Sequence, residues 1–280
     1  MNKKRVTKSL IGKIPLLLIV VFFFSLVFFM FLRAQELHEK KDIDKDISKT
    51  TNKTTTTISH KTDKPKLLLI CDDVITAKQV RKLTDMNLNI TISFLPPTKF
   101  HKMSAKIAKN VPNHMVHYPL EAFNYKHPEQ NTLKVDDSFE TINQTTKKLM
   151  RLYPNTKYLN NHTGSKFTSS DIAMDRLMRS FKENNLTFLD SKTSGKTVGK
   201  KYAKKYGVNF MIRDIFLDNI IEPDYIRAQL KKAVKIAIKN GKAIAIFHPH
   251  NISIKSIKNS KDILKDVDVI YIKDYDIQNR

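Results

Sequence analysis

The chain has 280 residues, with 50 Lys and Arg against 27 Asp and Glu, and its formal net charge is +23. Its 41% hydrophobic residues suffice for one large domain or two small ones, so a wholly disordered chain is excluded. Because Cys71 is the single cysteine, a disulfide framework and a thiolate-rich zinc site are excluded as well. Any metal site must be built from His and carboxylate side chains.

The N-terminal segment predicts a membrane anchor. Residues 14–32 carry no charge, and at about 1.5 Å rise per residue a helix of that length crosses a hydrocarbon core of roughly 30 Å. No small-x-small cleavage pattern follows, which favours an uncleaved signal anchor over a cleaved signal peptide. The five basic residues within residues 1–13 predict a cytoplasmic arm. The protein is therefore expected in the inner (cytoplasmic) membrane of a bacterium, with its C-terminal part outside the cytoplasm.

Residues 33–65 are Thr-rich with few large apolar groups, and we expect a disordered tether there. Of the total charge, +5 falls on the arm, +3 on residues 33–66 and the remaining +15 on residues 67–280. Such a basic domain suggests nucleic acid, but the expected location and the lack of a nucleic-acid-binding motif argue against it. A solvated Lys-rich surface or attraction to an anionic envelope polymer fits better, and no protein partner is predicted.

Residues 66–280 form the predicted domain, in which short apolar runs alternate with amphipathic segments. A helix is expected after Ser138, another between a cap among residues 168–170 and Phe181, and a third from Ile226 to Ile238 with Gly241 as its C-cap. Strands are expected at residues 67–71, 90–95, 114–118, 157–161, 186–189, 208–212, 243–247 and 269–272. This alternation predicts an α/β fold with a mainly parallel sheet, either a barrel or an open sheet.

Polar side chains follow six of these strands at their C-terminal ends, which lie on one face of a parallel α/β fold. A single Asp or His there is usually a cap or a surface residue, but six such strand ends in one chain predict a site. The residues are Asp72, Asp73, His117, Asn161, His162, Asp190, Asp214, Asp218, His248 and His250. Imidazole and carboxylate ligands without thiolate suit zinc or another divalent first-row ion. The expected reaction class is metal-assisted hydrolysis of an amide or ester.

Seven motifs then point to a family: LICDD (69–73), SFLP (93–96), HYPLE (117–121), NNHTGSKFT (160–168), FLDSKT (188–193), RDIFLDN (213–219) and FHPH (247–250). In this order they resemble the divergent polysaccharide deacetylases, a family similar to the carbohydrate esterases that remove N- or O-acetyl groups from sugars. The resemblance covers about residues 66–275. It implies a distorted (β/α) barrel, usually seven-stranded, with an Asp-His-His metal site.

The resemblance also implies roles for single residues. Asp72 would be the general base and Asp73 a metal ligand, while His117 and His162 replace the His-x-x-x-His ligands of the ordinary enzymes, a motif that is absent here. His248 would be the general acid, with His250 either assisting it or replacing one ligand. Supporting roles are expected for Asn161 and Arg213 in orienting the carboxylates, for the backbone of Gly164 and Ser165 beside the reacting carbonyl, and for Asp190, Asp214 and Asp218 around the site.

Three functions remain compatible with the sequence. The leading one is a membrane-anchored, metal-dependent hydrolase that removes acetyl groups from a cell-envelope polysaccharide or glycan, with zinc as the expected metal. The alternative is a catalytically silent glycan-binding or scaffold protein of the envelope that keeps the deacetylase fold. The third is an anchored protein that binds polyanions through its basic domain. The complete set of candidate ligands favours the first.

Overall fold

Nine strands, all paired in parallel, form the sheet of the computed structural model, which describes residues 64–277. They are β1 (Lys66–Val74), β2 (Thr91–Phe94), β3 (His114–Leu120), β4 (Tyr158–Thr163), β5 (Thr187–Asp190), β6 (Phe210–Ile212), β7 (Ile215–Phe216), β8 (Lys242–Phe247) and β9 (Asp268–Ile270). All eight strands predicted from the sequence are confirmed. The two-residue strand β7 is too short to leave a hydrophobic pattern and was not predicted.

The strand order is β6-β5-β4-β3-β2-β1-β8-β7, and β9 also pairs with β1. The chain between β6 and β7 joins the two ends of this sheet, because Arg213 N–H donates to the carbonyl of Asp190 beside β6 while Asp214 N–H donates to the carbonyl of Ile244 on β8, each at 3.0 Å. If β6 and β7 count as one interrupted strand, seven strands surround the barrel. The predicted distorted (β/α) barrel is therefore confirmed.

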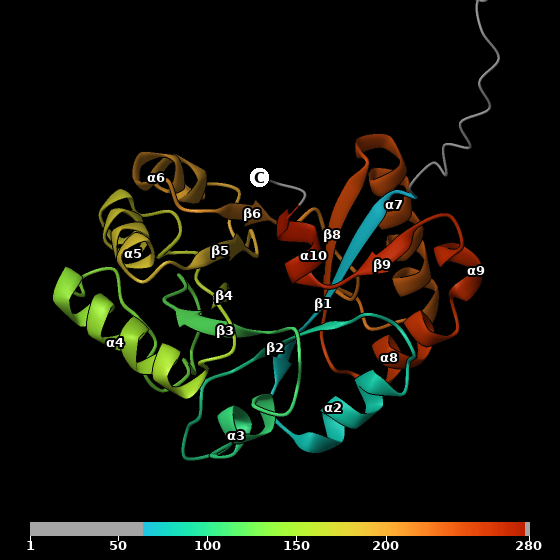
Figure 1. Cartoon of the computed structure of the whole chain (residues 1–280), viewed down its shortest axis with the longest axis horizontal. Coiled ribbons are helices and arrows are strands. Elements are labelled where there is room, and N and C mark those ends of the chain that lie inside the picture. The colour runs from blue at the N-terminus through green and yellow to red at the C-terminus, as the bar shows by residue number, and fades with distance from the viewer. Residues whose placement is uncertain (1–63, 278–280) are drawn as a thin grey trace, which may run out of the picture. The chain divides into compact units, whose positions relative to one another are not determined.

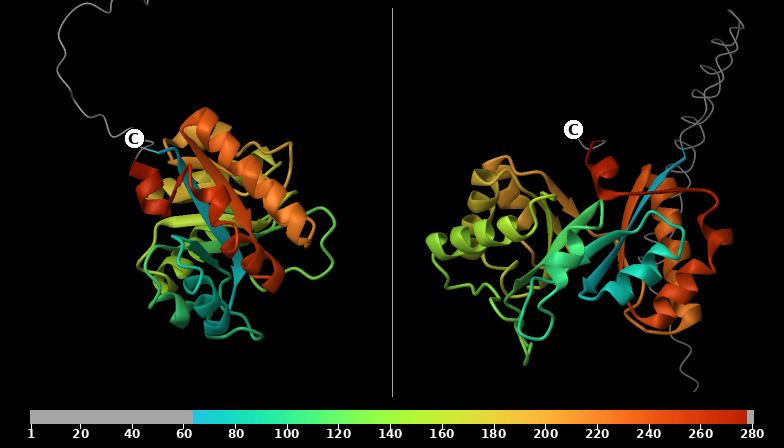
Figure 2. Two further views of the ribbon diagram at one scale, coloured as in Figure 1. Left: turned by 90° about the vertical axis from the view of Figure 1, so that its right-hand side faces the viewer. Right: turned by 60° about the horizontal axis from the view of Figure 1, so that its bottom comes forward.

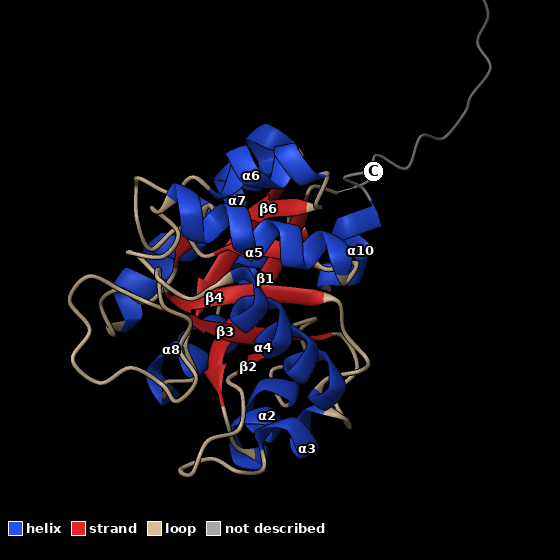
Figure 3. Cartoon of the chain, turned by 90° about the vertical axis from the view of Figure 1, so that its left-hand side faces the viewer, coloured by secondary structure: helices blue, strands red, loops and turns tan. Residues whose placement is uncertain are grey.

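Helices cover the outside of the strands (Figures 1 and 3). Figures 1 and 2 show α4 to α6 on one side of the barrel and α7 to α9 on the other. The helices of the described range are α2 (Ala77–Thr84), α3 (Ser104–Ala108), α4 (Phe139–Leu152), α5 (Asp171–Glu183), α6 (Gly199–Tyr206), α7 (Pro223–Asn240), α8 (Asn251–Lys258), α9 (Lys261–Leu264) and α10 (Ile272–Ile277).

The predicted helix ends are confirmed by cap geometry. The Ser138 hydroxyl accepts from Thr141 N–H at 3.1 Å at the start of α4, and Ser170, out of the three candidates, caps α5 by accepting from Ala173 N–H at 3.3 Å. Gly241 ends α7 in the left-handed conformation with φ 78°. One detail differs, because Ile238, expected on the buried face of α7, is 52% exposed.

Two apolar layers follow from the alternation of side chains along each strand. Leu67, Leu69 and Cys71 on β1 belong to the large cluster that contains the outer helices. The intervening Leu68 and Ile70 belong to a second cluster inside the barrel, together with Met115, Tyr158, Leu189, Met211, Ile244, Ile246, Ile272 and Tyr275. Because Ile272 and Tyr275 come from α10, that helix fills the end of the barrel at which the strands begin.

The segments predicted at the N-terminus lie outside the described residues. They are the arm (1–13), the membrane helix (14–32) and almost all of the tether (33–65). Within residues 64–277, none of the helices combines the length and the apolar character that a bilayer span needs.

Candidate metal centre

The end of β1 carries the two adjacent carboxylates, and its backbone departs from a regular strand there. Asp73 has φ 56°, and the register with β2 shifts between Cys71 and Val74. In a regular strand, neighbouring side chains point to opposite faces. The left-handed residue changes this direction, so that Asp73 Oδ1 and Asp72 Oδ2 lie 3.2 and 3.6 Å from the same atom, His117 Nε2. Both carboxylates therefore reach one site.

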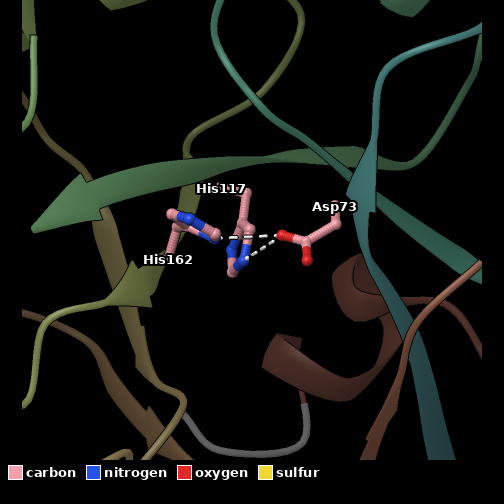
Figure 4. Close-up of side chains that lie close together, drawn as sticks. All are labelled: Asp73, His117 and His162. Carbon is pink, nitrogen blue, oxygen red and sulfur yellow. Dashed lines mark ion pairs between the residues drawn. The ribbon is translucent and has the colours of Figure 1, made fainter. Parts of the chain in front are cut away.

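The two histidines come from the adjacent strands β3 and β4, where Pro119 is the register partner of His162. Asp73 Oδ1 lies 3.2 Å from His117 Nε2 and 3.0 Å from His162 Nδ1 (Figure 4). The two imidazole rings meet edge to face with their centroids 4.9 Å apart. One ligand atom from each of the three residues lies within 4.8 Å of the others. The structure therefore brings Asp73, His117 and His162 together as one cluster.

The cluster fits a cation by a test that does not depend on the resemblance. Asp73 Oδ1 is buried, yet it makes no hydrogen bond of good geometry within the described residues. Buried polar atoms without partners are rare because they cost free energy, and a coordinated ion would satisfy this oxygen. One carboxylate oxygen and two imidazole nitrogens, with positions left for water and substrate, are the donor set of a catalytic divalent metal such as zinc.

The charge of Asp73 suits a ligand. Burial by itself would raise the pKa of its carboxyl group, but the close imidazoles of His117 and His162 outweigh burial and hold that pKa well below its usual range. Asp73 is therefore ionised at any physiological pH.

Asp72, beside the cluster, has a different environment. Its side chain is 1% exposed, and burial raises the pKa of its carboxyl group against the opposing effect of His117 and His248. The amide of Asn160 on β4 donates to both carboxylate oxygens, at 2.9 and 3.0 Å. A carboxylate of raised pKa next to a metal position is suited to accept a proton.

His248 follows β8 and is paired with Asp218. Asp218 Oδ1 lies 3.0 Å from His248 Nδ1, and Asp218 Oδ2 accepts from the backbone N–H of His248 at 2.8 Å and from the hydroxyl of Ser253 at 2.7 Å. Burial lowers the pKa of the imidazole, but the hydrogen bond and charge of Asp218 outweigh burial, and the pKa is raised to about 9. His248 is therefore protonated at neutral pH and can donate a proton.

His250 takes no part in the metal cluster. It is exposed, it stands at the N-cap position of α8, and its ring centroid lies 6.1 Å from that of His248. Of its two expected roles, this position favours assistance to His248 over replacement of a ligand.

Asn161 and Arg213 hold a neighbouring loop rather than the carboxylates. Asn161 Oδ1 accepts from Ser191 N–H at 2.8 Å, and its amide donates to the carbonyl of Thr163 at 2.6 Å. The Arg213 guanidinium donates to the carbonyls of Ser191 and Lys192 at 2.6 and 3.0 Å. Their contacts therefore differ from the expected role. For Asn161 the reason is strand alternation, which points its side chain away from the face that Tyr158 and Asn160 share.

The remaining predicted residues support the backbone around the site. Asp190 accepts from Lys192 N–H at 2.7 Å and from the Thr197 hydroxyl at 2.5 Å, so it shapes the loop after β5. Asp214 accepts from the backbone N–H of Ile244 at 2.7 Å and ties the β6–β7 segment to β8.

Gly164 and Ser165 lie just after β4, next to His162. Gly164 has φ 88°, and its carbonyl accepts from Thr168 N–H at 2.8 Å. The Ser165 hydroxyl accepts from Phe123 N–H at 3.2 Å and so ties this turn to the loop that follows β3.

Four residues near the cluster were not singled out from the sequence: Ser93, Tyr125, Asn160 and Ser191. Asn160 was within reach of sequence reasoning, since it stands two residues after Tyr158 and strand alternation places both on the inside of the barrel. Tyr125 packs its ring edge against His162, with centroids 6.1 Å apart, from a loop whose path no local pattern predicts.

The fold and the site define the class of this protein as a polysaccharide-deacetylase-like (β/α) barrel with a candidate Asp-His-His metal centre. The chain belongs to the divergent polysaccharide deacetylase family, whose model matches residues 69–275. The resemblance inferred from the motifs is thereby confirmed.

Two curated relatives are similar to the chain. It is 30% identical over 195 residues to the uncharacterized protein YibQ of Escherichia coli, covering 69% of this chain and 61% of YibQ. It is 29% identical over 186 residues to an uncharacterized protein of Haemophilus influenzae, covering 66% of each. The chain thus spans between three fifths and two thirds of the length of these relatives.

A solved structure, that of an uncharacterized protein from Agrobacterium tumefaciens, superposes with a TM-score of 0.65 at 20% identity and covers 75% of this chain and 88% of its own. The likeness supports the barrel fold.

Proposed function

We propose that this protein is a membrane-anchored, zinc-dependent hydrolase that removes acetyl groups from a polysaccharide or glycan of the cell envelope. The observation that carries the proposal is the cluster of Asp73, His117 and His162, in which the buried Asp73 Oδ1 lacks a hydrogen-bond partner of good geometry, next to the buried carboxylate of Asp72. Membership of the divergent polysaccharide deacetylase family supports deacetylation as the reaction.

The side chains around the cluster supply the acid and the base that amide or ester hydrolysis needs. A zinc ion held by the three ligands would polarise the acetyl carbonyl and lower the pKa of the attacking water. The carboxylate of Asp72, held by Asn160, accepts the proton of that water. His248, with a pKa of about 9, donates its proton to the leaving nitrogen or oxygen of the sugar, and Asp218 stabilises the protonated imidazole until then.

The location of the substrate follows from the predicted anchor. Residues 14–32 would hold the protein in the inner membrane, and the catalytic domain would meet its glycan outside the cytoplasm. The charge of +15 on residues 67–280 favours an anionic envelope polymer over a neutral one. We expect neither a nucleic acid nor a protein partner.

The experiment is an acetate-release assay with the full-length protein in detergent, using acetylated chitooligosaccharides and peptidoglycan fragments. We expect release that stops on chelation and returns with zinc, together with about one equivalent of bound metal. Less than about 0.1 equivalent of any transition metal, and none on titration, would exclude the hydrolase. Stoichiometric metal without acetate release from any envelope glycan would instead favour the catalytically silent glycan-binding protein.

A further inference from the structure

Asn160 lies between the candidate base and a candidate metal ligand. It is fully buried on β4, and its register partner on β3 is His117. Its Nδ2 atom donates to both oxygens of Asp72, at 2.9 and 3.0 Å, and to Ser191 Oγ at 3.1 Å. Its Oδ1 atom lies 3.0 Å from His117 Nδ1 and accepts from the Ser93 hydroxyl at 2.6 Å. The two donors and two acceptor positions of this amide are thus all used.

The hydrogen bonds to these partners define the orientation of the amide. The NH₂ group of Asn160 faces both oxygens of Asp72 and donates to them. The amide oxygen then faces His117, and since this oxygen only accepts, His117 Nδ1 must carry a proton. A neutral imidazole protonated on Nδ1 has its free lone pair on Nε2. That nitrogen is the one that faces Asp73 Oδ1, at 3.2 Å.

We infer that Asn160 is a positioning residue that holds His117 in its metal-binding tautomer with one end and aims the Asp72 carboxylate with the other. The part concerning Asp72 rests on the proposed function, whereas the part concerning His117 requires only that the cluster binds a metal. Because both ends belong to one rigid, buried side chain, the geometry of the base is coupled to that of the ligand. Hydrogen-bond partners behind metal ligands commonly contribute 10–100-fold to metal affinity or activity.

Two substitutions separate the two ends. Asn160→Asp keeps an oxygen that accepts from His117 Nδ1 but loses the donor to Asp72 and places a second negative charge beside it. Asn160→Leu has a similar size and loses both ends. We therefore expect Asn160→Asp to retain metal affinity while kcat falls, and Asn160→Leu to lose metal affinity by about 10–100-fold together with kcat.

Asn143 offers a matched control for the loss of a buried amide. It lies on α4, is 5% exposed, and its Oδ1 accepts from Ser180 at 3.0 Å and from Asn184 at 2.9 Å, all on the outer helices. Asn143→Leu removes a comparable network away from the cluster. We expect it to lower the melting temperature while the affinity for the metal and the ratio of kcat to KM stay at the wild-type values.

The experiment uses the full-length chain in detergent, titrated with Co²⁺ and Zn²⁺ alone, and acetate release is measured in parallel. The cobalt absorption spectrum reports the geometry of the ligands, and ¹⁵N NMR of the metal-free protein, at alkaline pH where the imidazole of His117 is neutral, reports which nitrogen carries its proton. We expect a proton on Nδ1 of His117 in the wild type and a loss of this preference in Asn160→Leu.

The inference would be overturned if Asn160→Leu bound cobalt with the affinity and the spectrum of the wild type. It would also be overturned if His117 of the wild-type protein were protonated on Nε2 alone. The NMR measurement on the wild type decides even if Asn160→Leu does not fold. Absence of metal binding by the wild type would refute the proposed function instead, and the two failures are therefore distinguishable.

Discussion

Asp72 and Asp73 are adjacent in the chain, yet their surroundings shift their pKa values in opposite directions. Burial dominates for Asp72 and raises its pKa, whereas two imidazoles outweigh burial for Asp73 and lower its pKa. Two carboxylates held in different environments take different roles in many hydrolytic sites, one exchanging protons and the other staying charged. The same logic supports Asp72 as the proposed base and Asp73 as the proposed ligand without reference to the order of the motif.

The separation of these roles predicts the behaviour of Asp72→Asn. The substitution removes the group that accepts a proton but leaves Asp73, His117 and His162 in place. We expect kcat for acetate release to fall by about 10²–10⁴-fold. The dissociation constant for zinc, measured by titration, should stay close to that of the wild type. A loss of zinc binding in Asp72→Asn would assign this residue to the metal instead.

A second prediction concerns the pH dependence set by Asp218. Its carboxylate raises the pKa of His248 to about 9, whereas burial alone lowers that pKa. In Asp218→Asn the pKa of His248 should fall below about 9, because burial still lowers it and only the charges of Asp72 and Asp73 still raise it. A general acid works only while protonated, so the alkaline limb of the kcat/KM profile should move from about 9 to lower pH.

The control for this profile is Asp175→Asn, because Asp175 lies on α5 and pairs with Lys205 away from the cluster. Its alkaline limb should remain where it is in the wild type. An unchanged limb in Asp218→Asn would show that His248 is not the acid.

At the scale of elements, the turn after β4 holds His162 in position. Gly164 has φ 88°, and an added Cβ atom would approach Leu120 Cβ to 2.9 Å, at the end of β3. An alanine there meets both backbone strain and overlap with a buried side chain. We expect Gly164→Ala to lower the free energy of unfolding by about 1–3 kcal/mol, measured by denaturant titration.

Gly195 is the matched control, since it lies in the loop after β5 and an added Cβ would meet nothing within 4 Å. Gly195→Ala should leave the free energy of unfolding within about 0.5 kcal/mol of the wild type. Equal stability of the two variants would contradict the strain assigned to the turn.

The strands also show how far the sequence could predict the site. Short apolar runs located eight strands, and the polar residues after them identified the face on which Asp73, His117 and His162 meet. Strand alternation would have selected Asn160, since it is separated from Tyr158 by one residue. The left-handed backbone of Asp73 could not be read from the sequence, because it arises where β1 loses its register with β2. Such tertiary effects leave no local pattern.

At the scale of the whole molecule, the metal cluster and the chain entry lie at opposite ends of the barrel. The described chain enters at β1, where the Lys64 ammonium group donates to the carbonyl of Lys265 at 2.7 Å, and α10 fills this end of the interior. The cluster lies where β1, β3 and β4 end. The inner apolar cluster separates the site from the entry, and together with the outer cluster it forms a core that does not depend on the metal.

A metal-independent core together with a metal site predicts how stability responds to zinc. A ligand that binds only the folded state stabilises it by about 4 kcal/mol at a thousand times its dissociation constant. For a domain of this size, that free energy corresponds to a rise in melting temperature of roughly 8–16 °C. We expect the chelated protein to unfold cooperatively and the zinc-loaded protein to unfold at this higher temperature.

His162→Ala should abolish the difference, because it removes one of three ligands. His127→Ala, at an exposed position outside the cluster, should preserve it. Noncooperative unfolding after chelation would show that the metal is needed to hold the strands together, and a zinc response in His162→Ala equal to that of the wild type would place the ion elsewhere.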